Sequence, residues 1–185
     1  MKNIILIPLI ALFSLNSKAE IMDESYLTAN LGSSFLSWEE LDGNSTYWSI
    51  GLGYELSQYL NFRIGYEDYG SVEGDWITEP VAGIVSSHGA VEAQGIYAIY
   101  SPDIKITEKL TFSPKAGAVY MDSFARPDFY NDPEILYKDR DWALKLAIEG
   151  KYKVNEKINA GIEYNYINID RINLASLSLS LQLEF

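Results

Sequence analysis

The sequence contains no cysteine, a single histidine and few basic residues. Without cysteine the chain has no disulfide scaffold, no zinc–thiolate site, no catalytic thiol and no lipoprotein anchor. One histidine excludes a metal site built from several imidazoles. Because 14 basic residues face 26 acidic ones, the formal net charge is −12. This charge argues against nucleic acid as a partner, since nucleic acid binds to basic surfaces.

Long hydrophobic runs are also missing, except near the start of the chain. The sequence begins with a positive charge at Lys2, continues with an almost wholly apolar stretch over residues 4–15, and reaches a small-residue cleavage site ending in Ala19. This order is typical of a secretory signal peptide, and the stretch is too short to span a bilayer as a helix. We therefore predict a signal peptide over residues 1–19 and a mature chain over residues 20–185.

The rest of the chain alternates between apolar and polar residues. The clearest case is the final segment, where leucines and Phe185 alternate without error with serine, glutamine and glutamate. A period of two indicates a β-strand with one apolar face. The pattern predicts eight strands, whose alternating parts cover roughly seven to twelve residues. They lie near residues 26–32, 47–56, 60–67, 91–100, 110–121, 142–149, 158–166 and 177–185.

The connections between these strands are short at some places and long at others. Residues 57–59 and 155–157 predict tight turns, because the flanking alternation resumes at once. Residues 35–45, 70–89 and 122–141 predict long loops. Short turns at one end of a barrel and long loops at the other are typical of outer-membrane barrels.

Alternation alone also fits a soluble barrel, which turns its apolar face inward. Three features favour the membrane. The polar face is rich in glycine, which weakens a strand unless space is tight. Aromatic residues of the apolar face lie near the strand ends, as expected at two lipid–water interfaces. The last residue, Phe185, lies on the apolar face. The predicted aromatic girdles contain Trp48, Tyr54, Tyr66, Tyr120, Trp142, Tyr152 and Tyr164.

Several short sequence motifs resemble those of a known family. Gly51-Leu-Gly-Tyr54, Arg63-Ile-Gly-Tyr-Glu67 and Gly161-Ile-Glu-Tyr164 look like the OmpA-like transmembrane domain and its small relatives of the OmpX/Ail kind. The resemblance implies an all-β, eight-stranded antiparallel up-and-down barrel in the outer membrane of a Gram-negative bacterium. Both termini would lie in the periplasm, and membrane lipid and lipopolysaccharide would surround the barrel.

The last nine residues, Leu177-Ser-Leu-Ser-Leu-Gln-Leu-Glu-Phe185, resemble the terminal signal that outer-membrane barrels present to their assembly machinery. The resemblance implies that the barrel assembly machinery is a partner. It would read an assembly signal made of Leu181, Leu183 and Phe185.

Charged residues on the polar face would point into the barrel interior. Buried charges must be paired, and the interior of an eight-stranded barrel is just wide enough for side chains to fill. A core held by ion pairs is therefore the simpler interpretation, and a gated proton or ion path is the alternative. The predicted interior charges are Arg63, Glu67, Glu92, Lys115, Lys145, Glu149 and Glu163.

The long loops are acidic and carry aromatic residues, and they are the part of the sequence that indicates a function. We predict a structural or surface-interaction role, in adhesion or host contact, with no catalytic residue, metal or other cofactor. One alternative is a narrow pore or a channel for small hydrophobic ligands. A further alternative is a lipid A-modifying enzyme that uses Ser87 and His88. Because adjacent strand residues point to opposite faces, a loop histidine is the simpler interpretation of His88.

Overall fold

The computed structural model describes residues 25–38, 41–57, 60–78, 85–127, 137–169 and 172–185. The predicted signal peptide, residues 1–19, lies outside the described residues. Within those ranges, no helix is long and apolar enough to cross a membrane.

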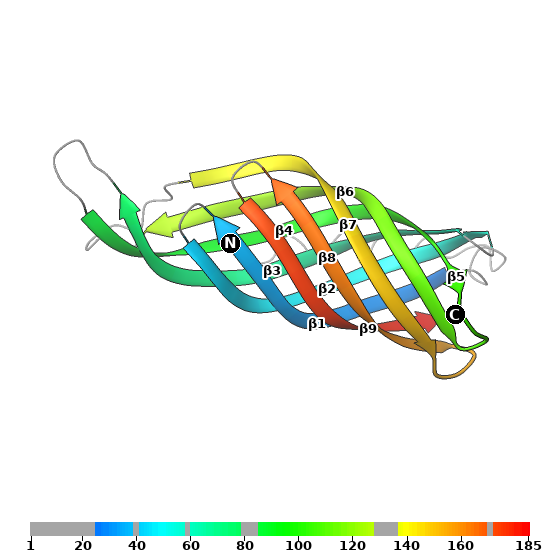
Figure 1. Cartoon of the computed structure of the whole chain (residues 1–185). Helices are drawn as coiled ribbons and strands as arrows, with labels where there is room; N and C mark the ends of the chain where they lie inside the picture. The colour runs from blue at the N-terminus through cyan, green and yellow to red at the C-terminus, as the bar shows by residue number, and fades with distance from the viewer. Residues whose placement is uncertain (1–24, 39–40, 58–59, 79–84, 128–136, 170–171) are drawn as a thin grey trace.

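Eight long antiparallel strands form a closed barrel (Figure 1). The short strand β5 (Ile104–Lys105) lies in the connection between β4 and β6, and β4 pairs directly with β6. Pairing of β1 with β9 closes the sheet. The predicted all-β up-and-down barrel is therefore confirmed. The strands of its wall are β1 (Ser25–Trp38), β2 (Leu41–Ser57), β3 (Leu60–Thr78), β4 (Val85–Pro102), β6 (Leu110–Pro127), β7 (Tyr137–Lys153), β8 (Ile158–Ile169) and β9 (Ile172–Glu184).

The strands extend further than the alternation predicted. Strand β3 has 19 residues, and the β3–β4 and β6–β7 pairs occupy most of segments 70–89 and 122–141. The prediction of long loops is therefore wrong for these segments, which are extended hairpins. It is also wrong for residues 35–45, where β1 and β2 stay paired as far as Trp38 and Leu41. Alternation fades where both faces of a hairpin leave the membrane, whereas the pairing of the backbone continues. Figure 1 shows the β3–β4 hairpin projecting furthest from the barrel, at the left.

The two ends of the described chain meet at one end of the barrel. The backbone N–H of Phe185 donates a hydrogen bond to the carbonyl oxygen of Ser25, with an N···O distance of 3.2 Å. The tight turn between β7 and β8 lies at this end, which we call the turn end (Figure 1, right). The opposite end, where the β3–β4 and β6–β7 hairpins project, is the hairpin end.

The pairing register fixes the width of the barrel. A row of outward-facing partners leaves β7 at Trp142, passes once around the sheet and returns to β7 at Tyr152, ten residues along the strand. Eight strands with this stagger leave an interior that side chains can fill. At about 3.3 Å per residue and a tilt of about 45°, this stretch has a height of roughly 23 Å, close to the apolar band of outer-membrane barrels.

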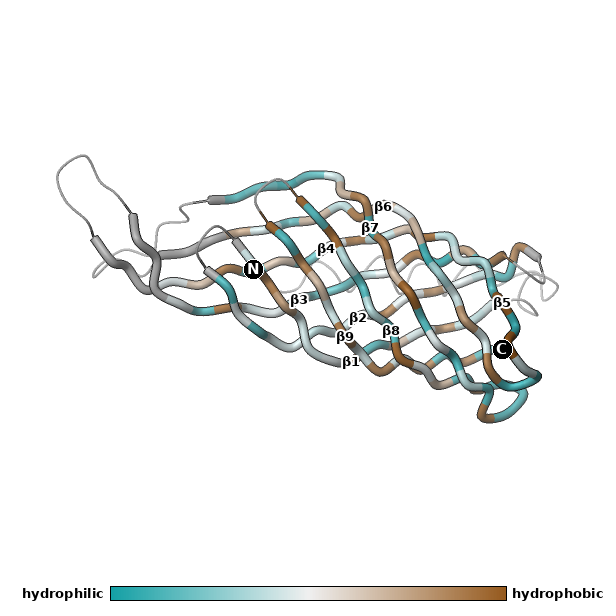
Figure 2. The backbone as a smooth tube through the Cα atoms, viewed as in Figure 1, coloured by the Kyte–Doolittle hydropathy of each residue, from teal (hydrophilic) through white to brown (hydrophobic). Residues whose placement is uncertain are grey.

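The outer face of the barrel is apolar between these two levels. Leu31, Leu144 and Leu179 are each more than 60% exposed, and apolar and polar residues alternate along the strands in Figure 2. All seven predicted girdle residues lie on this outer face, half-buried or exposed. The rings of Trp48 and Tyr66 lie 5.4 Å apart between centroids, so neighbouring girdle residues also pack against each other.

Near the hairpin end, β7 continues beyond its last paired residue toward β8, Lys145. The backbone N–H groups of Arg140 and Trp142 donate to the carboxylates of Asp139 and Asp141, with N···O distances of 2.7 Å. Both N–H groups lie on the side away from β6. Because unpaired edge donors invite pairing with another chain, these aspartates protect the edge of β7.

Candidate functional site

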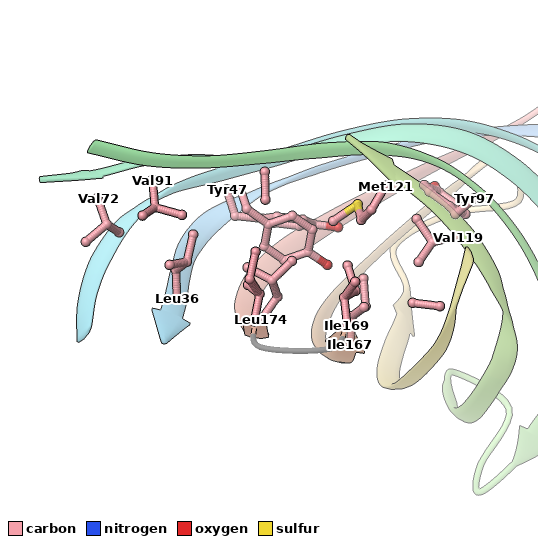
Figure 3. Close-up of a cluster of buried hydrophobic side chains, with 14 of the residues drawn as sticks. Leu36, Tyr47, Val72, Val91, Tyr97, Val119, Met121, Ile167, Ile169 and Leu174 are labelled. Carbon is pink, nitrogen blue, oxygen red and sulfur yellow. The ribbon is translucent and has the colours of Figure 1, made fainter. Parts of the chain in front are cut away.

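The barrel interior has a polar half and an apolar half. The polar half lies toward the turn end and contains buried charged side chains from β3, β6, β7 and β8. The apolar half lies toward the hairpin end (Figure 3). Its cluster includes Leu36, Tyr47, Tyr69, Val72, Met121, Ile167, Ile169 and Leu174.

Glu163 on β8 is the centre of the polar half and is 1% exposed. Its Oε2 accepts a hydrogen bond from Nη2 of Arg63 at 2.9 Å and forms an ion pair with Nζ of Lys115. Its other oxygen accepts from the amide of Asn30 at 3.1 Å. The carboxylate therefore joins side chains of β1, β3 and β6 across the barrel.

Lys115 extends this network to a second acid. Its Nζ lies 2.5 Å from Oε2 of Glu149, whose other oxygen accepts from the hydroxyl of Ser180 at 2.5 Å. One ammonium group is therefore shared by two carboxylates, an arrangement that compensates buried charge only while all three groups are present.

A separate ion pair lies at the turn end. Nζ of Lys151 is 2.8 Å from the carboxylate of Asp103, in the β4–β6 connection. Burial would raise the pKa of Asp103, but the charge of Lys151 and hydrogen bonds from Lys151, Ser113 and Asn61 hold this pKa below its ordinary value. Asp103 is therefore stabilised as a carboxylate where the interior opens.

A second buried cluster forms around Glu67, at the boundary with the apolar half. Glu67 pairs with Lys145 and accepts hydrogen bonds from the hydroxyls of Tyr47 at 3.2 Å and Tyr69 at 3.3 Å. These two tyrosines belong to the apolar cluster. Their rings therefore face apolar neighbours while their hydroxyls satisfy a buried charge.

Tyr97 on β4 separates the two charged clusters. Its ring lies 5.6 Å from the guanidinium carbon of Arg63 and 4.9 Å from Nζ of Lys145, within cation–π range. A side chain at Gly51 or Gly65 would place its Cβ within 2.6 Å of the Tyr97 hydroxyl. These two glycines therefore leave the space that the ring occupies.

Six of the seven predicted interior charges lie together, and Glu92 does not. The six are three bases and three acids, so the group is formally neutral: Arg63, Lys115, Lys145, Glu67, Glu149 and Glu163.

The prediction for Glu92 is wrong because β4 is oriented the other way. Val91 and Tyr97 are buried inside the barrel, whereas Ile96 is 63% exposed on the outer face. Glu92 shares the side of Ile96. Strand β4 crosses the apolar half of the interior, so around Ile96 and Tyr97 it is apolar on both faces, and alternation does not show which face points inward. For the same reason, the sequence does not indicate that Tyr97 points into the interior.

A small cavity of about 10 Å³ lies in the polar half, lined by Arg63 and Ser101 among others. Nε of Arg63 and Oγ of Ser101 are buried and have no hydrogen-bond partner among the described residues. A cavity of this size holds about one water molecule. The side chains around this cavity therefore enclose little free space.

The predictions of no metal and no catalytic residue concern groups that the structure describes only in part. Among the described side chains, no group of three or more histidine or acidic residues is placed to hold a metal ion. The side chains of Ser87 and His88 lie outside the described part of the chain.

A closed barrel with an apolar outer band and a filled interior defines an integral β-barrel of the outer membrane. Comparison with known proteins identifies the family. Residues 5–185 match the model of the outer membrane protein beta-barrel domain family, and the chain belongs to this family. The protein is therefore an outer-membrane β-barrel, and outer membranes of this kind belong to Gram-negative bacteria. No curated protein matches the sequence.

Solved structures share the fold at low sequence identity. Ail, the attachment invasion locus protein of Yersinia pestis, solved in complex with the heparin analogue sucrose octasulfate, is 12% identical with a TM-score of 0.60, over 88% of this chain and 98% of Ail. Neisserial surface protein A is 16% identical with a TM-score of 0.63, over 87% of this chain and 97% of that chain. OprG of Pseudomonas aeruginosa is 8% identical with a TM-score of 0.55, over 89% and 98%.

The network around Glu163 leads to a stability prediction. Glu163→Gln keeps the shape of the side chain but leaves the buried charge of Arg63 without its acid, so unfolding free energy should fall by about 3–5 kcal/mol. Urea titration in phospholipid vesicles measures this change. The matched control is Glu156→Gln in the exposed β7–β8 turn, which should change stability by less than about 0.5 kcal/mol. A loss below about 1 kcal/mol for Glu163→Gln would contradict a buried, paired network around Glu163.

Proposed function

We propose that the protein is a filled outer-membrane barrel that displays its hairpins at the cell surface, where they bind a partner in adhesion or host contact. The observation that carries this proposal is the length of the hairpins. Strands β3 and β4 remain paired from Ser71 and Glu92 to Thr78 and Val85, well beyond the girdle residue Tyr66. A connection between two strands needs far fewer residues.

The orientation follows from the two ends of the barrel. The turn end holds both described ends of the chain and is compact. In outer-membrane barrels, periplasmic turns are short and extracellular connections are long. We therefore place the turn end in the periplasm and the hairpin end outside the cell.

The printed names of two structural neighbours support a role at the surface. One is called an attachment invasion locus protein and the other a surface protein. Because their sequence identity to this chain is low, these neighbours support the fold directly. They support the surface role only through the architecture that they share with this chain.

A filled interior favours surface contact over a pore. The neutral ion-pair group and the apolar cluster occupy successive levels of the barrel. Water and ions would have to displace paired charges from one level and cross an apolar level next. For the same reason we assign the interior no catalytic role and treat its charged residues as structural.

Shortening the hairpins tests the surface role. Replacing residues 72–91 with Asn-Gly joins the paired residues Ser71 and Glu92 by a two-residue turn, and replacing residues 125–137 does the same for Phe124 and Lys138. Both variants should fold, as shown by a heat-dependent shift in gel mobility, and at least one should lose adhesion to host cells. An Asn-Gly turn in place of residues 155–157 is the control and should keep adhesion. Wild-type adhesion by both hairpin variants would argue against the proposal.

The last strand carries a further part of the proposal, which is that Leu181, Leu183 and Phe185 form the assembly signal. Phe185 is 44% exposed at the turn end, and its backbone bonds to the first described residue, Ser25. Recognition by the assembly machinery and anchoring at the interface are both served by an exposed ring at this place.

Deleting Phe185 separates recognition from stability. As a signal, Phe185 should be needed in cells, so its deletion should lower the yield of outer-membrane protein several-fold while refolding into detergent stays normal. Leu179→Ala, on the same strand and outer face, is the control and should keep the yield. A deletion variant with wild-type yield in cells, or with an equal loss in both settings, would refute the signal.

A further inference from the structure

A groove of about 290 Å³ lies on the barrel surface at the hairpin end, where β8, β9, β1 and β2 run side by side. Its lining combines aromatic, aliphatic, small and uncharged polar residues, with one acid. The aromatic and polar residues of the lining are Phe35, Ser37, Asp42, Asn44, Tyr166 and Asn173.

Two aromatic rings form the walls of this groove. Tyr166 on β8 and Phe35 on β1 both pair in register with Ala175 on the strand between them. The two rings are 40% and 45% exposed, and the small side chain of Ala175 leaves the space between them open. The row therefore presents two aromatic surfaces around a shallow floor.

The next row outward from the membrane is polar on all four strands. It consists of Asn168, Asn173, Ser37 and Asp42, which are consecutive partners in the register. The carbonyl oxygen of the Asn173 side chain accepts from the hydroxyl of Tyr166 at 3.1 Å and from the amide of Asn168 at 2.6 Å. Since both bonds use the oxygen, the amide nitrogen of Asn173 has no bond to another described residue in these two contacts and is available to donate to a ligand.

We propose that this groove binds a neutral saccharide ring. Sugar rings carry an apolar C–H face that packs on aromatic rings, and hydroxyl groups that both donate and accept hydrogen bonds. The two walls match the first property, and the Asn173 amide, the Ser37 hydroxyl and the Asp42 carboxylate, which line the groove, match the second. Asp42 and the net charge of −12 disfavour an anionic sugar.

The position of the groove separates this ligand from a lipid chain. On β8, Tyr166 lies two residues beyond the predicted girdle residue Tyr164, on the side of the hairpin end. The polar row lies further out, where an acyl chain would cover the polar side chains of Ser37, Asp42 and Asn173 without offering them a hydrogen bond. The inference rests on the proposed exposure of the hairpin end at the cell surface. There, saccharide comes either from the lipopolysaccharide of the same membrane or from outside the cell.

Titration of the folded protein with lactose, a neutral disaccharide, tests the proposal. In phospholipid nanodiscs, lactose should shift the backbone amide resonances of Asn44, Asn173 and Ala175, whereas sucrose octasulfate and decanoate should not. Phe35→Ala and Tyr166→Ala should each raise the Kd for lactose by roughly tenfold or more. Tyr120→Ala is the matched control, because Tyr120 is an exposed aromatic residue on β6, across the barrel from the groove. This variant should leave the Kd unchanged.

Repeating the titration in nanodiscs that contain lipopolysaccharide identifies the source of the sugar. If the sugar of the membrane fills the groove, the lactose shifts disappear there; if the ligand comes from outside, they persist. Both results support a saccharide site. No lactose shift in phospholipid alone, an equal effect of Tyr120→Ala, or shifts caused by decanoate instead would overturn it. None of these results bears on the hairpin variants, whose loss or retention of adhesion tests the proposed function separately.

Discussion

The constraint on which this structure depends is that backbone N–H and C=O groups inside lipid must bond to each other. Pairing of β1 with β9 meets this requirement by closing the sheet, and the bond between Phe185 and Ser25 continues the pairing to the turn end. Closure at the observed stagger then sets the width of the interior. A narrow interior of fixed width determines which side chains can face inward and leaves little space for anything else.

The interior meets this limit in two chemically different ways. In the polar half, three acids and three bases form a neutral group, with Glu163 contacting three strands. In the apolar half, tyrosines and aliphatic residues pack together, and the hydroxyls of Tyr47 and Tyr69 connect the two halves through Glu67. Because the barrel is filled at successive levels, we place recognition on its outside: on the projecting hairpins and in the groove between Phe35 and Tyr166.

The sequence predicted the barrel and most of its faces, because lipid on one side and a polar interior on the other impose a strict period of two. The predictions are wrong where the surroundings of a strand change, either inside the barrel or beyond the membrane. The prediction places Glu92 on the wrong face because β4 is apolar on both faces around Tyr97. It assigns loops to the projecting hairpins because alternation fades outside the membrane. The pairing of Lys145 with Glu67 and the place of Tyr97 depend on contacts across the barrel, which the register fixes and local sequence does not.

We propose that the interior is filled and closed to ions, and conductance across planar lipid bilayers tests this most directly. The wild-type protein, inserted in one orientation in potassium chloride, should produce no steady current above that of the bare bilayer. Opening would require paired charges such as Arg63 and Glu163 to separate, so we expect at most occasional brief events. Stable channels of uniform conductance from the wild-type protein would contradict the account.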